Sequence, residues 1–488
     1  MSEESKLSRR GFLETAGIAT GALAAASVFP HPAVGAVKGA NDRINFAILG
    51  PGGRAQAHID VLNKMKGEGK AVDTIAVADV FQRAREEAQK KTGAKQCEND
   101  YRKVLENKDV DAVVIATPDH WHAKMTIDAC DAGKDVYCEK PMTHTIDEAR
   151  RVVDAVQRNK RVMTVGVQST SDPRWRTAND LIKAGKIGHV MQAQTSYYRN
   201  SSVGQWRYYD LTEDMNPRTI DWKMFLGTEF GLAPDMPFNR AKYHQWRCYW
   251  EFGGGMYTDL FVHQLTHLIT AMGVRFPRRV VGAGGLYMEY DGRDVPDVAT
   301  VVADYDEGCQ VIVTATMCND HPIEEVIRGH TGTLNFTGDG FDILPQKLSN
   351  KPGTPNKKVS DAREHVAVSV PRDDTRALWD HFIECLRSRN PETLCPAELG
   401  YAAITTVNMG VKSYREGKAL FFDKATGEVS EADPSWAARW EERSELRGKP
   451  NQIIGWHAGL EGSELVPEPY QKLEGDWING KDPAAGKA

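Results

Sequence analysis

A short apolar run that leads straight into glycines constrains this fold more than any other feature of the sequence. Residues 44–49 have the pattern of a buried strand, and a glycine-rich turn follows before a helical pattern begins. Such a turn lets the backbone approach a pyrophosphate, and the next helix directs its first free N–H groups at that anion. The alternative is a glycine turn in an α/β domain that binds no ligand. We expect a dinucleotide to bind here, through Gly50, Gly52, Gly53 and Arg54.

An acidic residue lies near the end of a second predicted strand, residues 74–80. Asp79 could accept hydrogen bonds from the ribose hydroxyls of the dinucleotide. The same carboxylate would repel a 2′-phosphate, so NAD is favoured as the cofactor and NADP is the alternative. The interval from Gly50 to Asp79 exceeds the usual spacing of about 20 residues. We expect the loop that contains Gly67 and Gly69 to absorb the excess.

Two more apolar runs, residues 111–117 and 135–138, continue the pattern. Strands that alternate with helices form a parallel sheet with right-handed connections, and ligands lie beyond the carboxyl ends of its strands. Residues after these two strands are therefore candidates for the cofactor site: Thr117, Pro118, His122, Glu139 and Lys140.

The first forty residues have the pattern of a targeting signal. Ser8-Arg9-Arg10-Gly11-Phe12-Leu13 precedes an apolar stretch, and small residues at 33–36 could form a cleavage site. This is typical of a twin-arginine export signal. A membrane anchor is the alternative, but the stretch is shorter than the roughly 20 residues that span a bilayer. We expect residues 1–36 to direct transport by the export machinery, and the mature protein to be soluble and periplasmic.

Charge and cysteine spacing exclude other classes of protein. The chain of 488 residues has a formal net charge of -6, so it lacks the basic field that would hold a nucleic acid. The eight cysteines form no CxxC pair, which argues against a zinc ribbon or a dense disulfide framework. We therefore expect a small-molecule ligand and buried free thiols.

Three motifs in chain order carry a resemblance to a known family. They are the glycine turn at residues 50–53, the sequence TPDHWH at residues 117–122, and CEKP at residues 138–141. Together with a later glycine triplet and an Asp/His pair, they resemble the glucose-fructose oxidoreductase, inositol dehydrogenase and MocA family (Gfo/Idh/MocA). The resemblance spans about residues 43–420.

The resemblance implies an α/β fold with two domains. An N-terminal Rossmann domain is expected over residues 41–168, and a C-terminal α/β domain with a large, open, mainly antiparallel sheet over 169–422, followed by an extension at 423–488. The exposed face of that sheet usually serves in oligomerisation, so a homodimer or homotetramer is expected. A helix is predicted over residues 378–389. Alternating segments predict strands over residues 190–198, 279–287, 299–305, 310–317 and 332–337.

The resemblance also implies three catalytic residues, Lys140, Asp259 and His263. Oxidation of a carbinol needs a hydride acceptor, a base for the hydroxyl proton, and a positive group near the oxygen. We expect Lys140 beside the nicotinamide. We interpret His263 as the proton acceptor, because an ordinary imidazole titrates near neutrality, and Asp259 as its partner on the same helix face. The alternatives are a solvated surface lysine and a structural Asp/His pair.

His267 lies one turn beyond His263, and Thr266 stands where the family often has an aspartate, a departure that bears on the substrate. Two histidines four residues apart also resemble zincin spacing. The glutamate of metalloproteases is replaced by Gln264, and the family already accounts for Asp259 and His263. We therefore predict no metal at this site.

Candidates for the substrate side come from both predicted domains. Aromatic faces commonly stack on the apolar faces of sugars, although a packing role is the alternative for each such residue. Trp206, Tyr243 and Trp246 are further aromatic candidates, and His122 is interpreted as support for the cofactor or as an ordinary helix histidine. The predicted substrate residues are Gln168, Arg174, Trp175, Tyr198 and His267.

These features predict an exported, NAD(P)-dependent oxidoreductase that acts on a sugar or polyol hydroxyl with a tightly held cofactor. The periplasm has no replenished nicotinamide pool, so the redox cycle must close on the same nucleotide. An NAD-dependent glycoside hydrolase or epimerase, working through a transient keto-sugar, is the alternative. A binding protein that kept the fold without the chemistry is a third hypothesis.

Overall fold

The computed structural model describes residues 43–346, 362–445 and 480–481. The export signal predicted for residues 1–36 lies outside this part of the chain. The described residues belong to one compact unit. In the part of the chain described, no helix is both long and apolar enough to cross a bilayer.

The first half of the protein, residues 43–166, contains a six-stranded parallel sheet in the order β3-β2-β1-β4-β5-β6. Its central strands are buried on both faces, which explains why they read as continuous apolar runs. The predicted parallel sheet is thereby confirmed. The strands are β1 (Ile44–Leu49), β2 (Val72–Ala78), β3 (Gln96–Glu98), β4 (Ala112–Ile115), β5 (Asp135–Glu139) and β6 (Met163–Gly166).

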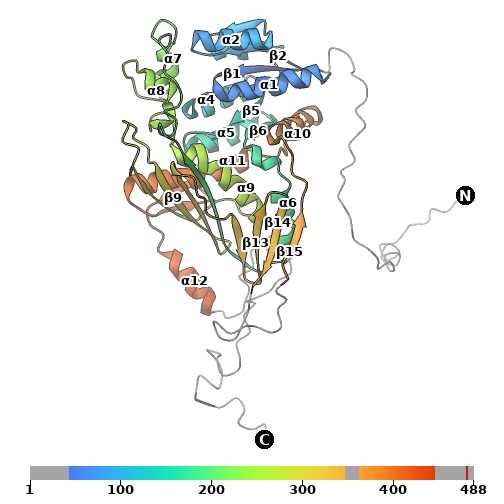
Figure 1. Ribbon diagram of the computed structural model, residues 1–488, viewed down its shortest axis with the longest axis vertical. Helices are drawn as coiled ribbons and strands as arrows, with labels where there is room; N and C mark the ends of the chain where they lie inside the picture. The colour runs from blue at the N-terminus through green and yellow to red at the C-terminus, as the bar shows by residue number, and fades with distance from the viewer. Residues whose placement is uncertain (1–42, 347–361, 446–479, 482–488) are drawn as a thin grey trace, which may run out of the picture. The chain divides into compact units, whose positions relative to one another are not determined.

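Helices connect these strands and cover the sheet, as the upper part of Figure 1 shows. One covering helix comes from far along the chain: α10 (Asp374–Ser388), the helix predicted over 378–389, packs Trp379 against Phe46 of β1 with ring centroids 5.4 Å apart. The other helices are α1 (Gly53–Gly67), α2 (Gln82–Thr92), α3 (Tyr101–Leu105), α4 (Asp119–Asp131) and α5 (Ile146–Arg158).

The second half contains an eleven-stranded sheet, mostly antiparallel, in the order β15-β14-β13-β12-β7-β10-β9-β8-β16-β17, with β11 paired to β7. Only the β7–β10 pair among these is parallel. The large, mainly antiparallel sheet is thereby confirmed. The strands are β7 (Val190–Asn200), β8 (Arg279–Gly285), β9 (Val298–Tyr305), β10 (Cys309–Thr316), β11 (Cys318–Asn319), β12 (Val326–Gly329), β13 (Gly332–Thr337), β14 (Gly340–Pro345), β15 (Glu364–Ala367), β16 (Leu420–Asp423) and β17 (Glu428–Ser430).

Three helices, α6 (Arg174–Lys183), α9 (Val262–Met272) and α11 (Ala397–Glu416), lie on one face of this sheet. Helix α11 also contacts α5, so it joins the two halves (Figure 1). Glycines allow its close approach to β8: a Cβ at Gly282 would lie 2.0 Å from the carbonyl oxygen of Gly410. Any larger residue at Gly282 would push the helix off the sheet.

A long connection between β7 and α9 reaches from the second half to the first. We call residues 201–250 the cover segment; it includes α7 (Trp222–Leu226), the 3-10 turns η3 (Thr228–Phe230) and η4 (Trp246–Cys248), and α8 (Arg240–His244). Figure 1 shows α7 and α8 beside the parallel sheet. Two backbone hydrogen bonds attach it there, from Gln82 N to Thr219 O (2.9 Å) and from Asp221 N to Val80 O (3.0 Å).

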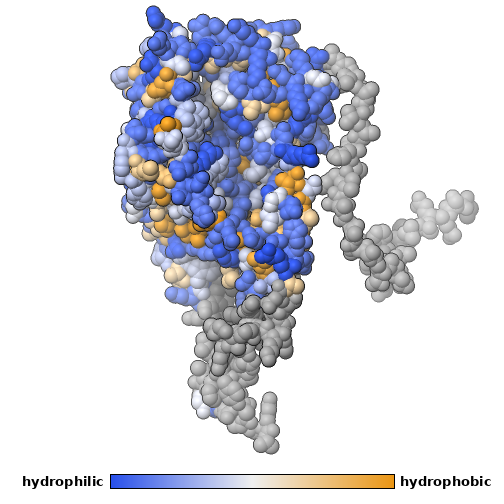
Figure 2. Space-filling view, viewed as in Figure 1, coloured by the Kyte–Doolittle hydropathy of each residue, from blue (hydrophilic) through white to orange (hydrophobic). Residues whose placement is uncertain are grey.

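The first part of the predicted C-terminal extension adds β17 to the sheet edge and then forms α12 (Ser435–Glu445). An ion pair between Arg278 and Asp433 (2.5 Å) attaches it to the second half. Figure 2 shows a mainly hydrophilic face, on which hydrophobic residues occur in small separate groups.

Candidate active site

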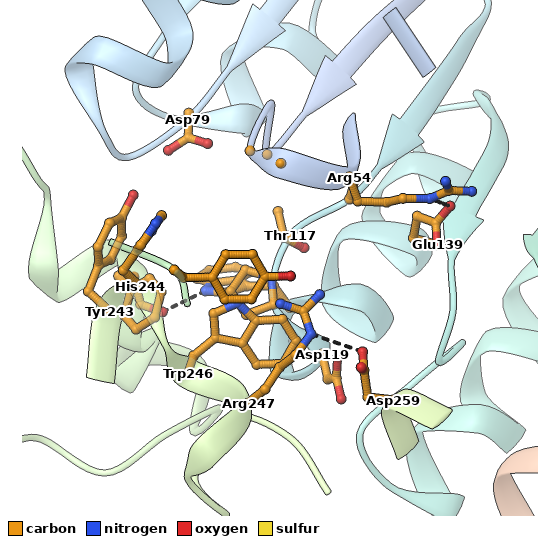
Figure 3. Close-up of a pocket in the computed structure, with 18 of the residues that line it drawn as sticks. Arg54, Asp79, Thr117, Asp119, Glu139, Tyr243, His244, Trp246, Arg247 and Asp259 are labelled. Carbon is orange, nitrogen blue, oxygen red and sulfur yellow. Dashed lines mark hydrogen bonds and ion pairs between the residues drawn. The ribbon is translucent and has the colours of Figure 1, made fainter. Parts of the chain in front are cut away.

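A cavity of about 670 Å³ opens at the carboxyl ends of the parallel strands, between these strand ends and the cover segment. Figure 3 shows side chains from both halves pointing into it. Most of the cofactor-side and all of the catalytic residues predicted from the sequence line this cavity: Gly50, Gly52, Gly53, Arg54, Asp79, Thr117, Pro118, Glu139, Lys140, Asp259 and His263.

The glycine turn has the geometry of a phosphate cradle. Gly50 has φ +76°, and a Cβ there would lie 2.5 Å from Cγ2 of Thr117, so only glycine fits. A Cβ at Gly52 or Gly53 would meet no atom within 4 Å, which leaves that backbone open to the cavity. Helix α1 begins at Gly53 without a side-chain cap, so its first N–H groups are available to an anion. The residues fit a dinucleotide pyrophosphate.

Asp79 follows β2 and faces the cavity opposite Tyr243 and His244 of the cover segment (Figure 3). One carboxylate oxygen accepts a hydrogen bond from Phe81 N (2.7 Å), which fixes the side chain and leaves the other oxygen for a ligand. Burial raises the pKa of Asp79 to about 6. The position fits the ribose ligand that the sequence predicts.

Glu139 is buried at the end of β5 and is held from three sides. Its carboxylate accepts hydrogen bonds from Arg54 Nε (2.8 Å) and from the backbone N–H of Lys140 (3.2 Å), and His58 Nε2 lies 2.8 Å away. Trp379 Nε1 donates to His58 Nδ1 (2.9 Å), so the other ring nitrogen carries the proton toward Glu139. Burial alone would raise the pKa of Glu139, but the charge of Arg54 and the His58 hydrogen bond hold it well below its usual range.

Lys140 and Asp259 form the centre of the site. Lys140 Nζ donates to Asp259 Oδ1 (2.6 Å) and to the backbone oxygen of the same residue (2.8 Å). Arg247 Nε donates to the same Oδ1 (2.9 Å), as Figure 3 shows. Burial would raise the pKa of Asp259, but these two cations hold it well below its ordinary range. One carboxylate is therefore shared between two positive groups at the cavity floor.

Asp259 lies in a π-helical turn, Tyr257–Phe261, that leads into α9. Such turns occur frequently at functional sites. His263 follows in the first turn of α9 and also lines the cavity. The sequence-based reason for its role as a base is not supported, because burial and then the charge of Lys140 lower the pKa of its ring to about 3. His263 is therefore a neutral imidazole at physiological pH.

Asp119, in the first turn of α4, adds a second carboxyl group beside this pair. It is 2% exposed and accepts a hydrogen bond from Thr258 Oγ1 (2.9 Å). Burial, and then the negative charge of Asp259, raise its pKa to about 7. At neutral pH, protonated and ionised forms of Asp119 therefore coexist.

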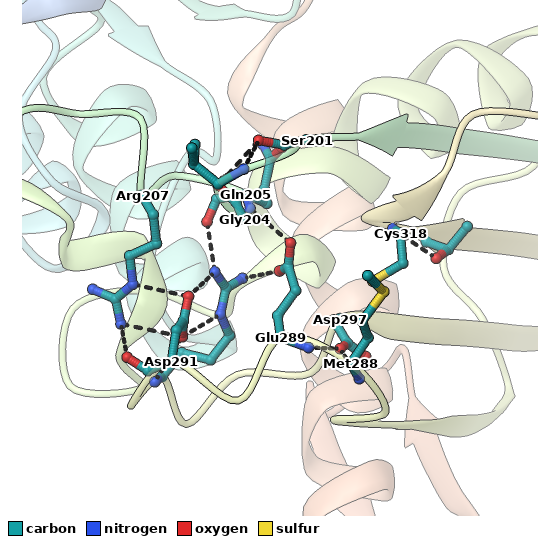
Figure 4. Close-up of polar contacts among 12 residues, drawn as sticks. Ser201, Gly204, Gln205, Arg207, Met288, Glu289, Asp291, Asp297 and Cys318 are labelled. Atoms are coloured by element: carbon teal, nitrogen blue, oxygen red, sulfur yellow. Dashed lines mark hydrogen bonds and ion pairs between the residues drawn. The ribbon is translucent and has the colours of Figure 1, made fainter.

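Part of the cavity wall is formed by the start of the cover segment, where Trp206 and Tyr208 line the cavity. Trp206 is 1% exposed and has φ +65°, an unfavourable backbone conformation for this residue that the surrounding contacts maintain. The buried Arg293 pairs with Asp291 (2.6 Å) and donates to the backbone oxygen of Gln205 (2.8 Å). Figure 4 shows Gln205, Glu289 and Asp291 within this group of polar contacts. This network holds the wall in place.

The predicted substrate residues lie elsewhere, and none of them lines the cavity within the described part of the chain. Arg174 pairs with Asp172 (2.6 Å), and Trp175 stacks on His267, with ring centroids 3.9 Å apart. Arg174 and Trp175 begin α6 and His267 lies within α9, so the stacked pair packs these two helices together. We correct the interpretation of Arg174, Trp175 and His267 accordingly.

Tyr198 and Gln168 are corrected for two other reasons. Tyr198 lies between Tyr197 and Arg199 in β7, and alternation along a strand directs it to the face opposite the cavity-lining Arg199. Gln168 lies behind Arg54, where its amide oxygen can accept from Arg54 Nη2 (3.1 Å). The less firm aromatic candidates Trp206, Tyr243 and Trp246 do line the cavity.

His122 is buried and connects two loops of the cofactor side. Its Nδ1 lies 2.6 Å from the backbone oxygen of Pro141, and its Nε2 lies 2.8 Å from that of Thr117. It does not line the cavity, so a supporting role fits better than contact with the cofactor. His267 Nε2 lies 2.8 Å from Glu325, away from Asp259. Within the described ranges, no group of three or more His, Cys, Asp or Glu is arranged to hold a metal.

Three charged residues that line the cavity were not predicted from the sequence: Asp119, Arg199 and Arg247. Asp119 was visible within the TPDHWH motif, directly after a strand end. Arg199 follows Tyr197 and Tyr198 at the end of a predicted strand, and the alternation of that strand could have revealed it. Nothing in the sequence pairs Arg247 with Asp259, because the turn between them sets their distance.

A parallel sheet with a glycine cradle, joined to a second sheet whose covering helix α9 and the turn before it supply His263 and Asp259, defines a two-domain nucleotide-binding α/β protein. The chain belongs to the Gfo/Idh/MocA oxidoreductase family. Residues 44–167 match the family model described as "Oxidoreductase family, NAD-binding Rossmann fold". Residues 179–420 match the one described as "Oxidoreductase family, C-terminal alpha/beta domain".

Curated relatives include a glycosyl hydrolase family 109 protein of Shewanella baltica, 27% identical over 233 residues, which cover 41% of this chain and 50% of the relative. An inositol 2-dehydrogenase of Salmonella typhimurium is 29% identical over 150 residues, 30% of this chain and 45% of the relative. The chain thus spans about half the length of these relatives. A solved levoglucosan dehydrogenase in complex with NADH shares the fold, with a TM-score of 0.57 and 19% identity over 77% of this chain and 98% of that one.

Proposed function

We propose that this protein is an NAD-dependent oxidoreductase that oxidises a hydroxyl group of a sugar or polyol. The observation that carries the proposal is the meeting of Lys140, Asp259 and His263 at the floor of the cavity that the glycine cradle opens into. The names of the inositol and levoglucosan dehydrogenases support it. The fold alone would not, because one fold serves many functions.

The cofactor, when bound, supplies a hydride acceptor at its nicotinamide. The glycine cradle would hold the pyrophosphate and Asp79 the ribose, so the strand ends that carry Lys140 lie toward the nicotinamide. The Lys140 ammonium group, fixed by Asp259, would stabilise the negative charge that develops on the hydroxyl oxygen. The neutral ring of His263 would accept the hydroxyl proton; burial makes its imidazolium unstable, so the ring would release that proton to water in the cavity.

We also propose that the dinucleotide stays bound through many turnovers. The cover segment lies over the cavity and is tied to the first half beyond β2, by the bridge between Phe81 and Ile220 and by the hydrogen bond from Asn99 to Asp221 (2.9 Å). Tyr243 packs on Phe81 with ring centroids 5.9 Å apart. A cofactor leaving the cavity would have to displace these contacts.

A redox-neutral reaction is the second candidate, because the Shewanella relative is named as a glycosyl hydrolase. In that reaction a ring hydroxyl would be oxidised to a ketone and the acidified neighbouring carbon would lose a proton. The leaving group would depart from the next carbon as a double bond forms, water would add at that carbon, and the hydride would then return from the cofactor to the ketone. The same cavity groups would serve, since the base that takes the hydroxyl proton can also take the carbon proton. Net oxidation and net hydrolysis differ in whether reduced cofactor accumulates.

A single-turnover experiment tests the proposal. Protein loaded with one equivalent of NAD⁺ is mixed with a panel of sugars, polyols and aryl glycosides, and reduced nicotinamide and released phenol are recorded together. Hydride transfer from a sugar or polyol supports the oxidoreductase. Phenol release that depends on NAD⁺ without net reduction supports the second candidate. A failure of every member to reduce the cofactor or release phenol contradicts both.

We propose further that the chain is exported by the twin-arginine pathway and works in the periplasm. The Arg9-Arg10 pair ahead of an apolar stretch supports this. Cell fractionation of a host that expresses the full chain tests it, with Arg9→Lys/Arg10→Lys as the variant. The wild type is expected in the periplasmic fraction and the variant in the cytoplasm; identical distributions of the two would contradict export by this route.

We propose a homodimer or homotetramer that associates through the exposed face of the large sheet. Val281 on β8, 40% exposed, and Met191 on β7, 45% exposed, are apolar groups of that sheet that association could cover. Light scattering coupled to size exclusion gives the mass in solution. A mass equal to one chain would contradict the proposal.

A further inference from the structure

Arg199 is a positive group in the cavity that the proposed chemistry does not use. It lies at the end of β7 and lines the cavity near Lys140 and Asp259. Its guanidinium group lies 4.7 Å from the ring centroid of Tyr197 and donates to the hydroxyl of the same residue (2.5 Å). The side chain is therefore held at the cavity wall by a neutral neighbour.

The other arginines of the cavity have carboxylate partners. Arg54 pairs with Glu139 (2.8 Å) and Arg247 pairs with Asp259 (2.9 Å). Among the residues that the structure describes, no carboxylate lies within ion-pair distance of Arg199. Asp259 is a negative neighbour of Arg199, but its carboxylate is already paired with Lys140 and Arg247. A half-buried cation without an ion-pair partner of its own favours the binding of a negatively charged ligand.

Arg199 is also fixed in position. The amide of Gln205, buried at 2% exposure, can turn its oxygen toward Arg199 Nη1 (3.2 Å), the hydroxyl of Tyr208 (3.1 Å) and Nε1 of Trp206 (3.3 Å). Gln205 is itself held by its backbone N–H, which donates to Glu289 (2.8 Å), within the network of Figure 4. Two of the five N–H groups of the guanidinium are engaged, so three are left for a ligand.

The position of Arg199 separates it from the cofactor phosphates. The pyrophosphate is expected at the glycine cradle and the start of α1, on the first half, whereas Arg199 comes from the second half. Its electrostatic neighbours are Tyr197, Tyr208 and Asp259. It is thus a neighbour of the catalytic centre, on the substrate side.

We propose that the substrate is an acidic sugar, a uronate or aldonate, whose carboxylate Arg199 binds; this rests on the proposed function. A planar guanidinium group matches a carboxylate through two parallel hydrogen bonds. The single negative charge of a carboxylate balances the one unpaired cation. A phosphorylated sugar carries about two negative charges near neutral pH, and this wall offers no second free cation among the described residues.

The test separates binding from chemistry. Protein loaded with NADH cannot accept a hydride, so calorimetry on it reports binding alone. The probes are D-glucuronate against D-glucose, D-gluconate against D-sorbitol, and D-glucose 6-phosphate. Arg199→Met removes the charge and keeps the bulk. Arg158→Gln, on the exposed end of α5 and paired with Asp131, is the matched control.

At least one acidic sugar is expected to bind the wild type about tenfold or more tightly than its neutral counterpart, the effect of one charge-assisted pair. Arg199→Met should abolish that preference, and Arg158→Gln should retain it. The inference is overturned if no acid binds, if the preference survives in Arg199→Met, or if the phosphate binds more tightly than every carboxylate. Arg199-dependent binding of an acid that never reduces bound NAD⁺ would instead contradict the proposed function.

Discussion

Lys140 Nζ lies 2.6 Å from Asp259 Oδ1, which joins the end of β5 to the π-helical turn before α9. The two residues are 119 positions apart and come from different halves of the chain. Arg247 shares the same carboxylate oxygen, so Asp259 stays paired if Lys140 is removed. The chemical role of Lys140 can therefore be tested without leaving a buried carboxylate without a partner.

Lys140→Met is expected to lower the rate of hydride transfer by about 10²- to 10³-fold, the usual effect of losing one group that stabilises the charge developing on the reacting oxygen. The affinity for NADH should change little, because the glycine cradle and Asp79 are untouched. Stopped-flow reduction of bound NAD⁺ and NADH titration give the two quantities. Lys66→Met, exposed on α1, is the control. A variant as fast as the wild type would remove Lys140 from the mechanism.

The choice between NAD and NADP should depend on pH through Asp79. Burial raises its pKa to about 6, so the carboxylate is charged above that pH and neutral below it. Repulsion of the 2′-phosphate should weaken as pH falls through about 6. The affinity for NADP relative to that for NAD should therefore rise about tenfold from pH 8 to pH 5. The 2′-phosphate also titrates, so Asp79→Asn is the reference. If this affinity ratio depended on pH equally in the wild type and in Asp79→Asn, Asp79 would not set the choice between NAD and NADP.

Asp119 should make the protein less stable as pH rises. Its pKa of about 7 lies above the ordinary value of about 3.9. The folded state therefore binds more protons than the unfolded state between these values, and this stabilisation is lost as pH rises toward 7. Asp119→Asn should remove this loss of stability. The difference between the thermal unfolding midpoints of the variant and the wild type should therefore be larger at pH 8 than at pH 5.

The control for that measurement is Asp109→Asn, at an exposed position. Its difference from the wild type should be the same at both pH values. If the advantage of Asp119→Asn were constant or shrank as pH rose, Asp119 would not carry a raised pKa in the folded protein.

The cover segment should slow the departure of the cofactor. Asp221 caps α7 through Met224 N (3.0 Å) and accepts from Asn99 (2.9 Å), so Asp221→Ala loses two hydrogen bonds. Each contributes about 1 kcal/mol, so the loss of both should raise the dissociation rate of NADH by roughly thirtyfold. Displacement of NADH by excess NAD⁺, followed by fluorescence, measures it. Asp235→Ala, exposed in the same segment, should leave the rate unchanged. Equal rates of NADH dissociation in both variants would show that the cover segment does not retain NADH.

The first half could be predicted from the sequence almost completely. Its strands are buried on both faces, so β1 and β5 appear as apolar runs that helical segments separate. The observed strand boundaries differ from the predicted ones by a few residues. The strand predicted over 74–80 ends at Ala78, because Asp79 turns the chain toward the cavity. The long interval before Asp79 is a fifteen-residue helix, α1, followed by a turn at Gly69.

The substrate side of the site could not be predicted in the same way. Tyr198 and Arg199 are neighbours in sequence, and only the register of β7 decides which of them faces the cavity. The interpretation of His263 assumed an imidazole with its ordinary pKa, whereas burial and the charge of Lys140 lower that pKa. The aromatic residues of the cover segment carry no periodic signal, so its attachment beside β2 is visible only in three dimensions.

Transfer of deuterium tests the central claim most directly. A substrate found in the single-turnover panel is labelled at the carbon that carries the reacting hydroxyl, mixed with the NAD⁺ form of the protein, and stopped by acid. Mass spectrometry of the released dinucleotide should then show one deuterium on the nicotinamide in the wild type and almost none in Lys140→Met. Conversion of the substrate with an unlabelled nucleotide at every time point would contradict hydride transfer at the Lys140–Asp259 centre.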